Sequence, residues 1–166
     1  KGRLVETMWL LIVKDGQLGS ALHKHFKCTG TSRHVGAKPY FQLTDDPKNL
    51  PEAEVVFIVA AKTKFRDCEI DEDAWRVNVD GPIRIGARYR ESFVVYISSE
   101  AAEWSGHTAY GDQKRFAEMG LRAVVPFNRL AIVRPDKVTP DRIDDLCKLV
   151  EKIGKEKVGG VYRFRK

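Results

Sequence analysis

The segment Tyr110–Lys114 (YGDQK) places a phenol and an ammonium four residues apart. Side chains at this spacing lie on the same face of a helix. A tyrosine has an unperturbed pKa near ~10 and exchanges protons poorly at neutral pH, but a nearby ammonium favours the phenolate and lowers that pKa. Ser99 follows a predicted strand and could hold a carbonyl oxygen. Together these groups suit proton transfer coupled to hydride transfer, although a Tyr-x-x-x-Lys pair alone is common on protein surfaces.

A glycine turn follows the first apolar run of the chain. Gly16 and Gly19, with Gln17 and Leu18 between them, open a predicted helix. Glycines let a backbone approach a pyrophosphate, and the helix N-terminus supplies free N–H groups, so the turn predicts dinucleotide binding; an ordinary tight turn is the alternative. The usual pattern has three glycines, and the first of them would be at position 13, where this chain has Val13. A β-branched residue does not readily adopt the backbone conformation that glycine takes there. We therefore expect weaker cofactor binding or an altered loop.

The residues at the end of the second predicted strand bear on whether the chain binds NAD or NADP. The stretch from position 29 to 34 (TGTSRH) contains hydroxyls and cations and no carboxylate. In nucleotide-binding folds of this type an acidic residue here favours NAD, and an arginine accommodates the 2′-phosphate of NADP. Arg33 could pair with that phosphate while Ser32 donates beside it. The prediction is NADP, with NAD as the other cofactor allowed and a solvated loop arginine as the alternative.

Short apolar runs alternate along the chain with amphipathic segments. The expected strands are 9–13, 28–33, 40–43, 55–60, 93–97, 129–133 and 159–164. The expected helices are 17–27, 71–90 with a bend at Gly81-Pro82, 110–123, and 139–153 with Thr139 as its N-cap. This alternation predicts an α/β class, a three-layer Rossmann-like fold whose doubly wound, mostly parallel sheet has helices on both faces. Ligands of such sheets bind beyond the carboxyl ends of the strands.

Composition limits the other possibilities. The 166 residues fit a single domain over 1–166, and 43% hydrophobic with 31% charged residues argues against disorder. No apolar run approaches the roughly 18–20 residues that span a bilayer, and none precedes a cleavage site, so we expect neither a membrane segment nor a signal peptide. The net charge of +6 is scattered; nucleic-acid binding would rest on charge alone and is not expected. The cysteines and histidines suggest no disulfide framework and no metal site, and a cytoplasmic setting fits: Cys28, Cys68, Cys147, His23, His25, His34 and His107.

With these pieces in order, the sequence resembles the short-chain dehydrogenase/reductase superfamily. It is most similar to the extended branch of sugar-nucleotide epimerases, dehydratases and reductases, including dTDP-4-dehydrorhamnose reductase-like proteins. The matching segments are DGQLGSAL (15–22), TGTSR (29–33), VVFIVAAKT (55–63), WRVNVDGP (75–82), VVYISS (94–99), YGDQK (110–114) and LAIVRPDKV (130–138). The resemblance implies a nicotinamide dinucleotide, a substrate such as a nucleotide sugar, and often a homodimer formed through helices 71–90 and 110–123.

The resemblance also implies roles for single residues. For the cofactor it implies Gly16, Gln17, Leu18, Gly19, Ser32, Arg33, Ala60, Ala61, Lys62, Tyr110, Lys114 and Arg134. For catalysis it implies Tyr110 as the acid–base group, Lys114 as its partner, Ser99 as the substrate-orienting serine, with Ser98 as an alternative, and Asn78 as the residue that orders the site. For Asn78 the alternative is a solvated helix asparagine or a local backbone hydrogen bond.

Two further departures from the family pattern concern the substrate. The loop between Ser99 and Tyr110 is short, which shortens one wall of a substrate pocket. Residues 139–164 resemble a late family segment, so the usual substrate-binding insertion is expected to be absent and Gly159–Phe164 to be a strand of the main sheet. Two functions remain open: an NAD(P)-dependent oxidoreductase or epimerase, and a non-catalytic NAD(P)-binding regulatory or sensor module.

Overall fold

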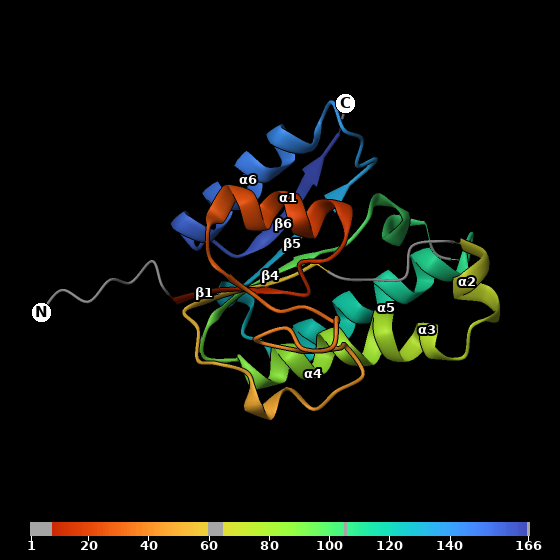
Figure 1. Cartoon of the computed structure of the whole chain (residues 1–166). Coiled ribbons are helices and arrows are strands. Elements are labelled where there is room, and N and C mark those ends of the chain that lie inside the picture. Colours follow the sequence, from red (N-terminus) through yellow and green to blue (C-terminus); the bar gives the residue numbers. More distant parts are fainter. Residues whose placement is uncertain (1–7, 60–64, 105, 166) are drawn as a thin grey trace, which may run out of the picture.

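A parallel sheet of six strands runs through the residues that the computed structural model describes, which are 8–59, 65–104 and 106–165 (Figure 1). In spatial order the strands are β2 (Thr29–Gly30), β1 (Trp9–Ile12), β3 (Val55–Ile58), β4 (Phe93–Ile97), β5 (Leu130–Pro135) and β6 (Gly160–Phe164). Every neighbouring pair is parallel. The predicted α/β class with a doubly wound parallel sheet is confirmed.

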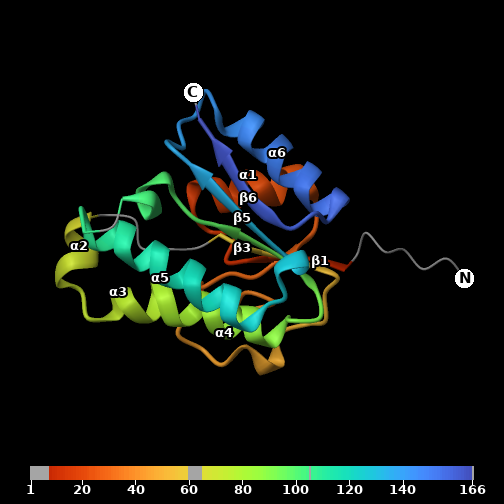
Figure 2. The ribbon, with the colours of Figure 1, turned by 180° about the vertical axis from the view of Figure 1, so that it is seen from behind.

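Helices cover both faces of this sheet (Figure 2). On one face lie α1 (Gln17–Phe26) and α6 (Ile143–Glu156), and on the other α4 (Gly81–Arg88) and α5 (Ala109–Val124). The shorter elements are α2 (Phe65–Ile70), α3 (Asp73–Trp75), the π-helical segment η3 (Arg76–Asp80) and the 3-10 turns η2 (Pro47–Asn49), η4 (Glu100–Glu103) and η5 (Phe127–Arg129).

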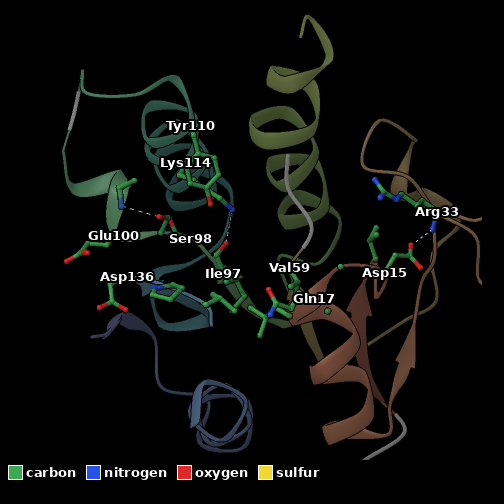
Figure 3. A pocket seen from close by; sticks show the side chains of 18 of the residues that line it. Asp15, Gln17, Arg33, Val59, Ile97, Ser98, Glu100, Tyr110, Lys114 and Asp136 are labelled. Carbon is green, nitrogen blue, oxygen red and sulfur yellow. Dashed lines mark hydrogen bonds between the residues drawn. The ribbon is translucent and has the colours of Figure 1, made fainter. Parts of the chain in front are cut away.

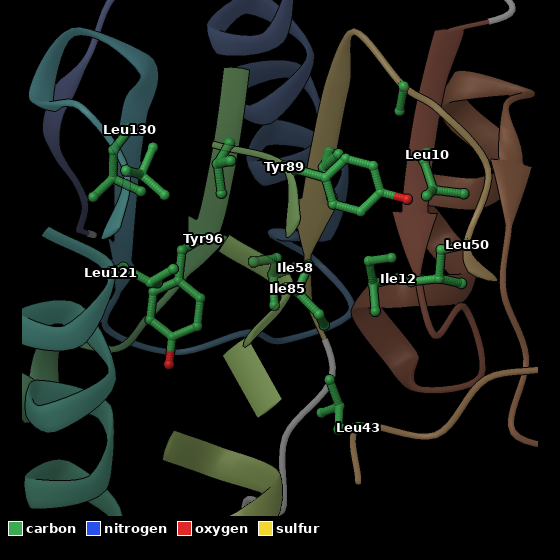
Figure 4. Close-up of a cluster of buried hydrophobic side chains, with 14 of the residues drawn as sticks. Leu10, Ile12, Leu43, Leu50, Ile58, Ile85, Tyr89, Tyr96, Leu121 and Leu130 are labelled. Carbon is green, nitrogen blue, oxygen red and sulfur yellow. The ribbon is translucent and has the colours of Figure 1, made fainter. Parts of the chain in front are cut away.

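Each face of the sheet buries its own apolar core. Because successive side chains of a strand point to opposite faces, Leu10 and Ile12 pack toward Ile85 and Leu121 of α4 and α5 (Figure 4). Leu11, between them in sequence, joins the core beneath α1 and α6. Burial on both faces explains why β3 and β4 are continuous apolar runs. The strand ends are thereby held in fixed register.

The strand order reverses between β1 and β3. From β1 the chain passes through α1 to β2 on one side, and the later strands add on the other side. In open α/β sheets a crevice for ligands forms at this reversal, beyond the carboxyl ends of the strands. The β1–α1 turn and the ends of β3, β4 and β5 therefore meet at one site.

The two strands expected between α1 and β3 differ from the prediction. The strand expected at 28–33 forms sheet pairs only over the two residues of β2. The strand expected at 40–43 is wrong, since an isolated bridge from Tyr40 to Ser32 is all that forms there in the described chain. Beyond β2 the backbone N–H of Ser32 donates to the Pro39 carbonyl and that of Arg33 to the Asp15 carboxylate in the β1–α1 turn, so neither N–H extends the pairing with β1.

The long helix expected over 71–90 is divided into α3, η3 and α4. Pro82 lies in the first turn of α4, where its missing N–H is tolerated. The N–H of Gly81 donates to the carbonyl of Arg76, five residues back, which is the hydrogen bond of a π-helix. The expected bend at Gly81-Pro82 is thus absorbed as a local widening of the helix.

The carboxyl-terminal helix and strand complete the sheet. α6 begins at Ile143, and the expected N-cap at Thr139 is wrong because its carbonyl instead accepts the N–H of Arg142 in a preceding turn (3.0 Å). The strand expected at 159–164 is confirmed as β6, which pairs in parallel with β5. The chain therefore passes from β5 to β6 through residues 136–159 alone, as expected without the substrate-binding insertion.

Candidate active site

A cavity of about 590 Å³ lies at the carboxyl ends of the strands (Figure 3). Its volume is that of a small-molecule or cofactor site, for which roughly 300–1,000 Å³ is typical. The β1–α1 turn contributes one end, and β4, α5 and the residues after β5 contribute the other. Of the predicted site residues it brings together Gly16, Gln17, Leu18, Gly19, Arg33, Ser99, Tyr110 and Lys114, together with Ser98, the alternative to Ser99.

The β1–α1 turn keeps the shape of a glycine turn despite its valine. Val13 has a positive φ of 58°, a left-handed backbone that is rare for a β-branched residue. Its N–H donates to the Thr31 hydroxyl (2.6 Å), and the next N–H, of Lys14, donates to the Thr31 carbonyl (2.7 Å). A Cβ on Gly19 would lie 3.0 Å from the Val13 carbonyl oxygen, so a larger residue there would fit only if the backbone of the turn moved.

The N-terminus of α1 faces this turn. Gly16 is its N-cap with an extended backbone, and it provides no side-chain hydrogen bond to the helix. The first turn contains no acidic residue. Because the first four N–H groups of a helix have no partner within it, they can bind an anion such as a pyrophosphate.

Ser99, Tyr110 and Lys114 meet at the other end of the cavity. The Ser99 and Tyr110 side chains are hydrogen-bonded. Lys114 is only 2% exposed, and its Nζ donates to the Ile97 carbonyl (2.9 Å). The same Nζ lies 5.8 Å from the centre of the Tyr110 ring. The spacing of four residues places Tyr110 and Lys114 on one face of α5, and Ser99, which follows β4, lines the cavity beside them.

Burial governs the ionisation of this pair. It raises the pKa of Tyr110 to about 12 against the opposing hydrogen bond from Ser99. It lowers the pKa of Lys114 to about 8 against the opposing charge of Glu118. The pKa of Tyr110 is therefore raised, not lowered, in this structure, because burial removes the water that would stabilise a phenolate. Tyr110 is therefore protonated at neutral pH.

Asn78 lies behind the pair, away from the residues that line the cavity. It is buried in η3, and its Nδ2 donates to Gln113 Oε1 (2.8 Å) and toward Cys68 Sγ (3.5 Å). Gln113 Nε2 in turn donates to the Cys68 carbonyl (3.1 Å). Gln113 and Cys68 were missed from the sequence, although Gln113 lies within the YGDQK motif. This cluster joins α2, η3 and α5 beneath the Tyr–Lys pair.

A second polar cluster engages Arg134 and Ser98. Arg134 donates two hydrogen bonds to the buried carboxylate of Glu118 (2.5 and 3.0 Å) and lies 3.5 Å from a carboxylate oxygen of Glu103. Ser98 donates to Glu118 as well (2.5 Å). Arg134 is not among the cavity residues, whereas Pro135 next to it is. Both serines line the cavity. The Ser98 hydroxyl is engaged by Glu118, and the Ser99 hydroxyl accepts the N–H of Ala101 (3.1 Å).

Asp15 is a site residue that the sequence reasoning missed. It lies in the turn just before Gly16 and lines the cavity beside Arg33. Its carboxylate accepts from the Ser32 hydroxyl (2.8 Å) and from the Arg33 N–H (2.8 Å). The signal was its place within the glycine motif, where a carboxylate lies near any bound dinucleotide.

Three predicted cofactor residues, Ala60, Ala61 and Lys62, lie outside the described residues.

Within the described ranges, histidine, cysteine, aspartate and glutamate side chains form no group of three or more that could hold a metal ion. In the same ranges, no helix combines the length and the apolar character needed to cross a membrane.

Comparisons with known proteins give similar folds and no similar sequences. No protein-family model matches the chain, and no curated protein matches it in sequence. A dTDP-4-dehydrorhamnose reductase from Clostridium acetobutylicum superposes with a TM-score of 0.76 at 21% identity, over 94% of this chain and 73% of that one. The Bacillus anthracis reductase, in complex with NADP, gives 0.79 at 17% identity over 95% and 74%. The Bordetella bronchiseptica enzyme WbmG, in complex with NAD and UDP, gives 0.71 at 15% identity over 94% and 71%.

Proposed function

We propose that this chain is an NAD(P)-dependent oxidoreductase of the sugar-nucleotide epimerase, dehydratase and reductase type. Its substrate would be a sugar nucleotide or a related compound with a carbonyl or hydroxyl group. The observation that carries the proposal is the single cavity that joins the Gly16–Gly19 turn to Ser99, Tyr110 and Lys114. An anion-binding helix end and a proton-transfer group then serve one ligand site.

The residues present fit a nicotinamide dinucleotide. The free N–H groups of the first turn of α1 suit a pyrophosphate. Gly19 keeps the backbone close-packed at that turn. The cavity extends from there to Tyr110, as a dinucleotide with its nicotinamide near the phenol would require. A dinucleotide bound there would supply or accept a hydride.

The side chains around Tyr110 favour the direction of carbonyl reduction. Ser99 would hold the carbonyl oxygen, and Tyr110, protonated because its pKa is about 12, would give its proton to that oxygen. One of the three N–H donors of Lys114 bonds to the Ile97 carbonyl, so two remain for ribose hydroxyls or the phenol. The same high pKa opposes proton abstraction from an alcohol at neutral pH.

The ligands of the structural neighbours support the substrate class. The Bordetella enzyme binds NAD and UDP, and the Bacillus reductase binds NADP. Both dinucleotides are thus compatible with the fold. In this chain Arg33 supports NADP, and the Asp15 carboxylate beside it acts in the opposite direction.

A non-catalytic NAD(P)-binding module is the second candidate. One observation favours it, the left-handed backbone of Val13 at the phosphate turn. This strain would reduce catalytic efficiency while leaving a dinucleotide site. The module would bind a dinucleotide and turn over no substrate.

Tyr110→Phe separates the two candidates. We expect turnover of 4-keto nucleotide sugars to fall by about 10²-fold or more, because the proton donor is lost, while the dissociation constants of NADH and NADPH stay within about threefold. Binding is measured by nicotinamide fluorescence, and turnover by absorbance of the reduced cofactor.

The matched control is Tyr162→Phe on β6, whose hydroxyl donates to the Val158 carbonyl, and it should keep full turnover. Dinucleotide binding with no turnover by the parent protein would favour the non-catalytic module. Binding of neither dinucleotide at millimolar concentration would contradict both candidates.

A further inference from the structure

Asp15 holds a fixed carboxylate at the end of the cavity opposite Tyr110 and Lys114 (Figure 3). Its side chain is only 10% exposed. The Ser32 hydroxyl donates to Oδ1 and the Arg33 N–H to Oδ2, both at 2.8 Å. The N–H of His34 donates to the Ser32 hydroxyl (3.1 Å), which fixes that hydroxyl in turn. The carboxylate is therefore oriented by two residues of the loop after β2.

This carboxylate is charged at neutral pH. Burial raises the pKa of Asp15, but the hydrogen bonds from Arg33 and Ser32 and the charges of His34 and Arg33 outweigh that effect, so the pKa lies below its usual value. A carboxylate offers about four lone-pair positions, and two are used here. Two positions remain to accept hydrogen bonds from a ligand.

The same contacts change the roles expected of Ser32 and Arg33. A hydroxyl has one proton, and Ser32 gives its proton to Asp15. The backbone N–H of Arg33 is likewise engaged by Asp15. Of the donors expected for a 2′-phosphate, the exposed guanidinium of Arg33 alone is uncommitted within the described residues, and it lies beside a fixed negative charge.

The position of this carboxylate along the cavity identifies the group it would meet. With the pyrophosphate at the N-terminus of α1 and the nicotinamide at Tyr110, the adenosine ribose lies toward the end of β2, where Asp15 is. A 2′-hydroxyl can donate to the carboxylate. A 2′-phosphate carries a charge of about −1.5 to −2 at neutral pH and is mostly without a proton to donate, so it is repelled.

We propose that Asp15 sets the dinucleotide preference of this protein, by accepting the 2′-hydroxyl of NAD(H) and repelling the 2′-phosphate of NADP(H). The proposal rests on the proposed function. It reverses the preference expected from Arg33 alone. Asp15 comes from the glycine turn, whereas the acidic residue that usually meets this hydroxyl follows the second strand.

Binding measurements on Asp15→Asn test the proposal. The parent protein should bind NADH more tightly than NADPH by direct fluorescence titration. Asn is close in shape and keeps an acceptor for the Arg33 N–H, so the NADPH dissociation constant should fall about tenfold or more while that of NADH rises or stays the same. Arg33→Ala should weaken NADPH in the same titration and leave NADH little changed.

Controls separate charge, folding and the wider function. Glu91→Gln removes one negative charge from a side chain that is far more exposed and lies outside the cavity, and it should leave both dissociation constants unchanged. Asp15→Ser provides a second neutral variant if Asp15→Asn does not fold, as judged by thermal unfolding. The role of Asp15 is overturned, and the proposed function stands, if the parent protein binds NADPH more tightly than NADH. The same holds if the ratio of the NADH and NADPH dissociation constants of the neutral variant lies within twofold of the parent's ratio. Absence of binding for both dinucleotides overturns it together with the proposed function.

Discussion

Val13 shows how a single residue retains a turn that its side chain disfavours. A left-handed backbone costs a residue other than glycine about 1–2 kcal/mol, and Val13 adopts φ 58°. Two hydrogen bonds to Thr31 fix the two peptide groups on either side of the Val13 Cα. The Val13 side chain is buried, with 6% exposed, so its packing offsets part of the strain.

The strain at Val13 predicts that the glycine variant at this position is more stable than the alanine variant. Both Val13→Gly and Val13→Ala lose most of the buried side chain, but only glycine is relaxed at this φ. We expect Val13→Gly to be more stable than Val13→Ala by about 1 kcal/mol, the reverse of the usual order within regular structure. Urea unfolding of the two variants gives the comparison, and an alanine variant that is the more stable would show that the turn is not strained.

At the scale of elements, close packing between α4 and α5 fixes the position of Tyr110 and Lys114. A Cβ on Gly86 of α4 would lie 2.4 Å from Leu121 Cδ2 and 3.2 Å from Val125 Cγ2, and one on Gly120 of α5 would lie 2.1 Å from Ile83 Cδ1. Glycines thus let the two helices approach on the same face of the sheet. The face of α5 that carries Lys114 lies against β4, where Nζ donates to the Ile97 carbonyl.

Gly86→Ala should therefore destabilise the protein although alanine is the better helix former. Alanine gains about 1 kcal/mol of helix propensity, but the new methyl group must displace the Leu121 side chain, and overpacking typically costs about 1–3 kcal/mol. We expect a net loss of about 1 kcal/mol in the free energy of unfolding, measured by denaturant titration.

The matched comparison is Gly16→Ala, where a Cβ meets no atom within 4 Å and φ is −81°. We expect its stability to stay within about 0.5 kcal/mol of the parent. An equal loss in both variants would show that the contact with Leu121 is not the cause.

Elements that bury a continuous apolar pattern could be predicted from the sequence, and those decided by polar contacts could not. The runs of β3 and β4 and the helix of Tyr110 were found because periodicity reports burial directly. The strand β2 ends before Arg33, whose backbone N–H bonds to the carboxylate of Asp15, eighteen residues earlier in the chain. Gln113 and Asn78 meet across thirty-five residues. No local pattern reports such contacts, so Asp15 and Gln113 were missed.

At the scale of the whole molecule, an apolar patch lies on α3 and α5. Trp75 and Phe116 contact each other with ring centroids 5.3 Å apart, and both remain about half exposed, as does Met119. The homodimer expected from the sequence would form through helices 71–90 and 110–123, and the patch lies on both segments. Contiguous exposed apolar groups of this kind are typical of interaction sites, and a two-fold dimer would bring the patch against its own copy.

Phe116→Arg tests whether this patch forms a dimer. The parent should sediment as a dimer at tens of micromolar, and the variant should be largely monomeric because two arginines would be brought together at the two-fold axis, where like charges are repelled. Phe127→Arg is the matched control, since Phe127 is 88% exposed and lies in η5 before β5, outside the patch. It should leave the sedimentation coefficient unchanged. A parent that is monomeric at this concentration, or equal dissociation in both variants, would contradict a dimer through α3 and α5.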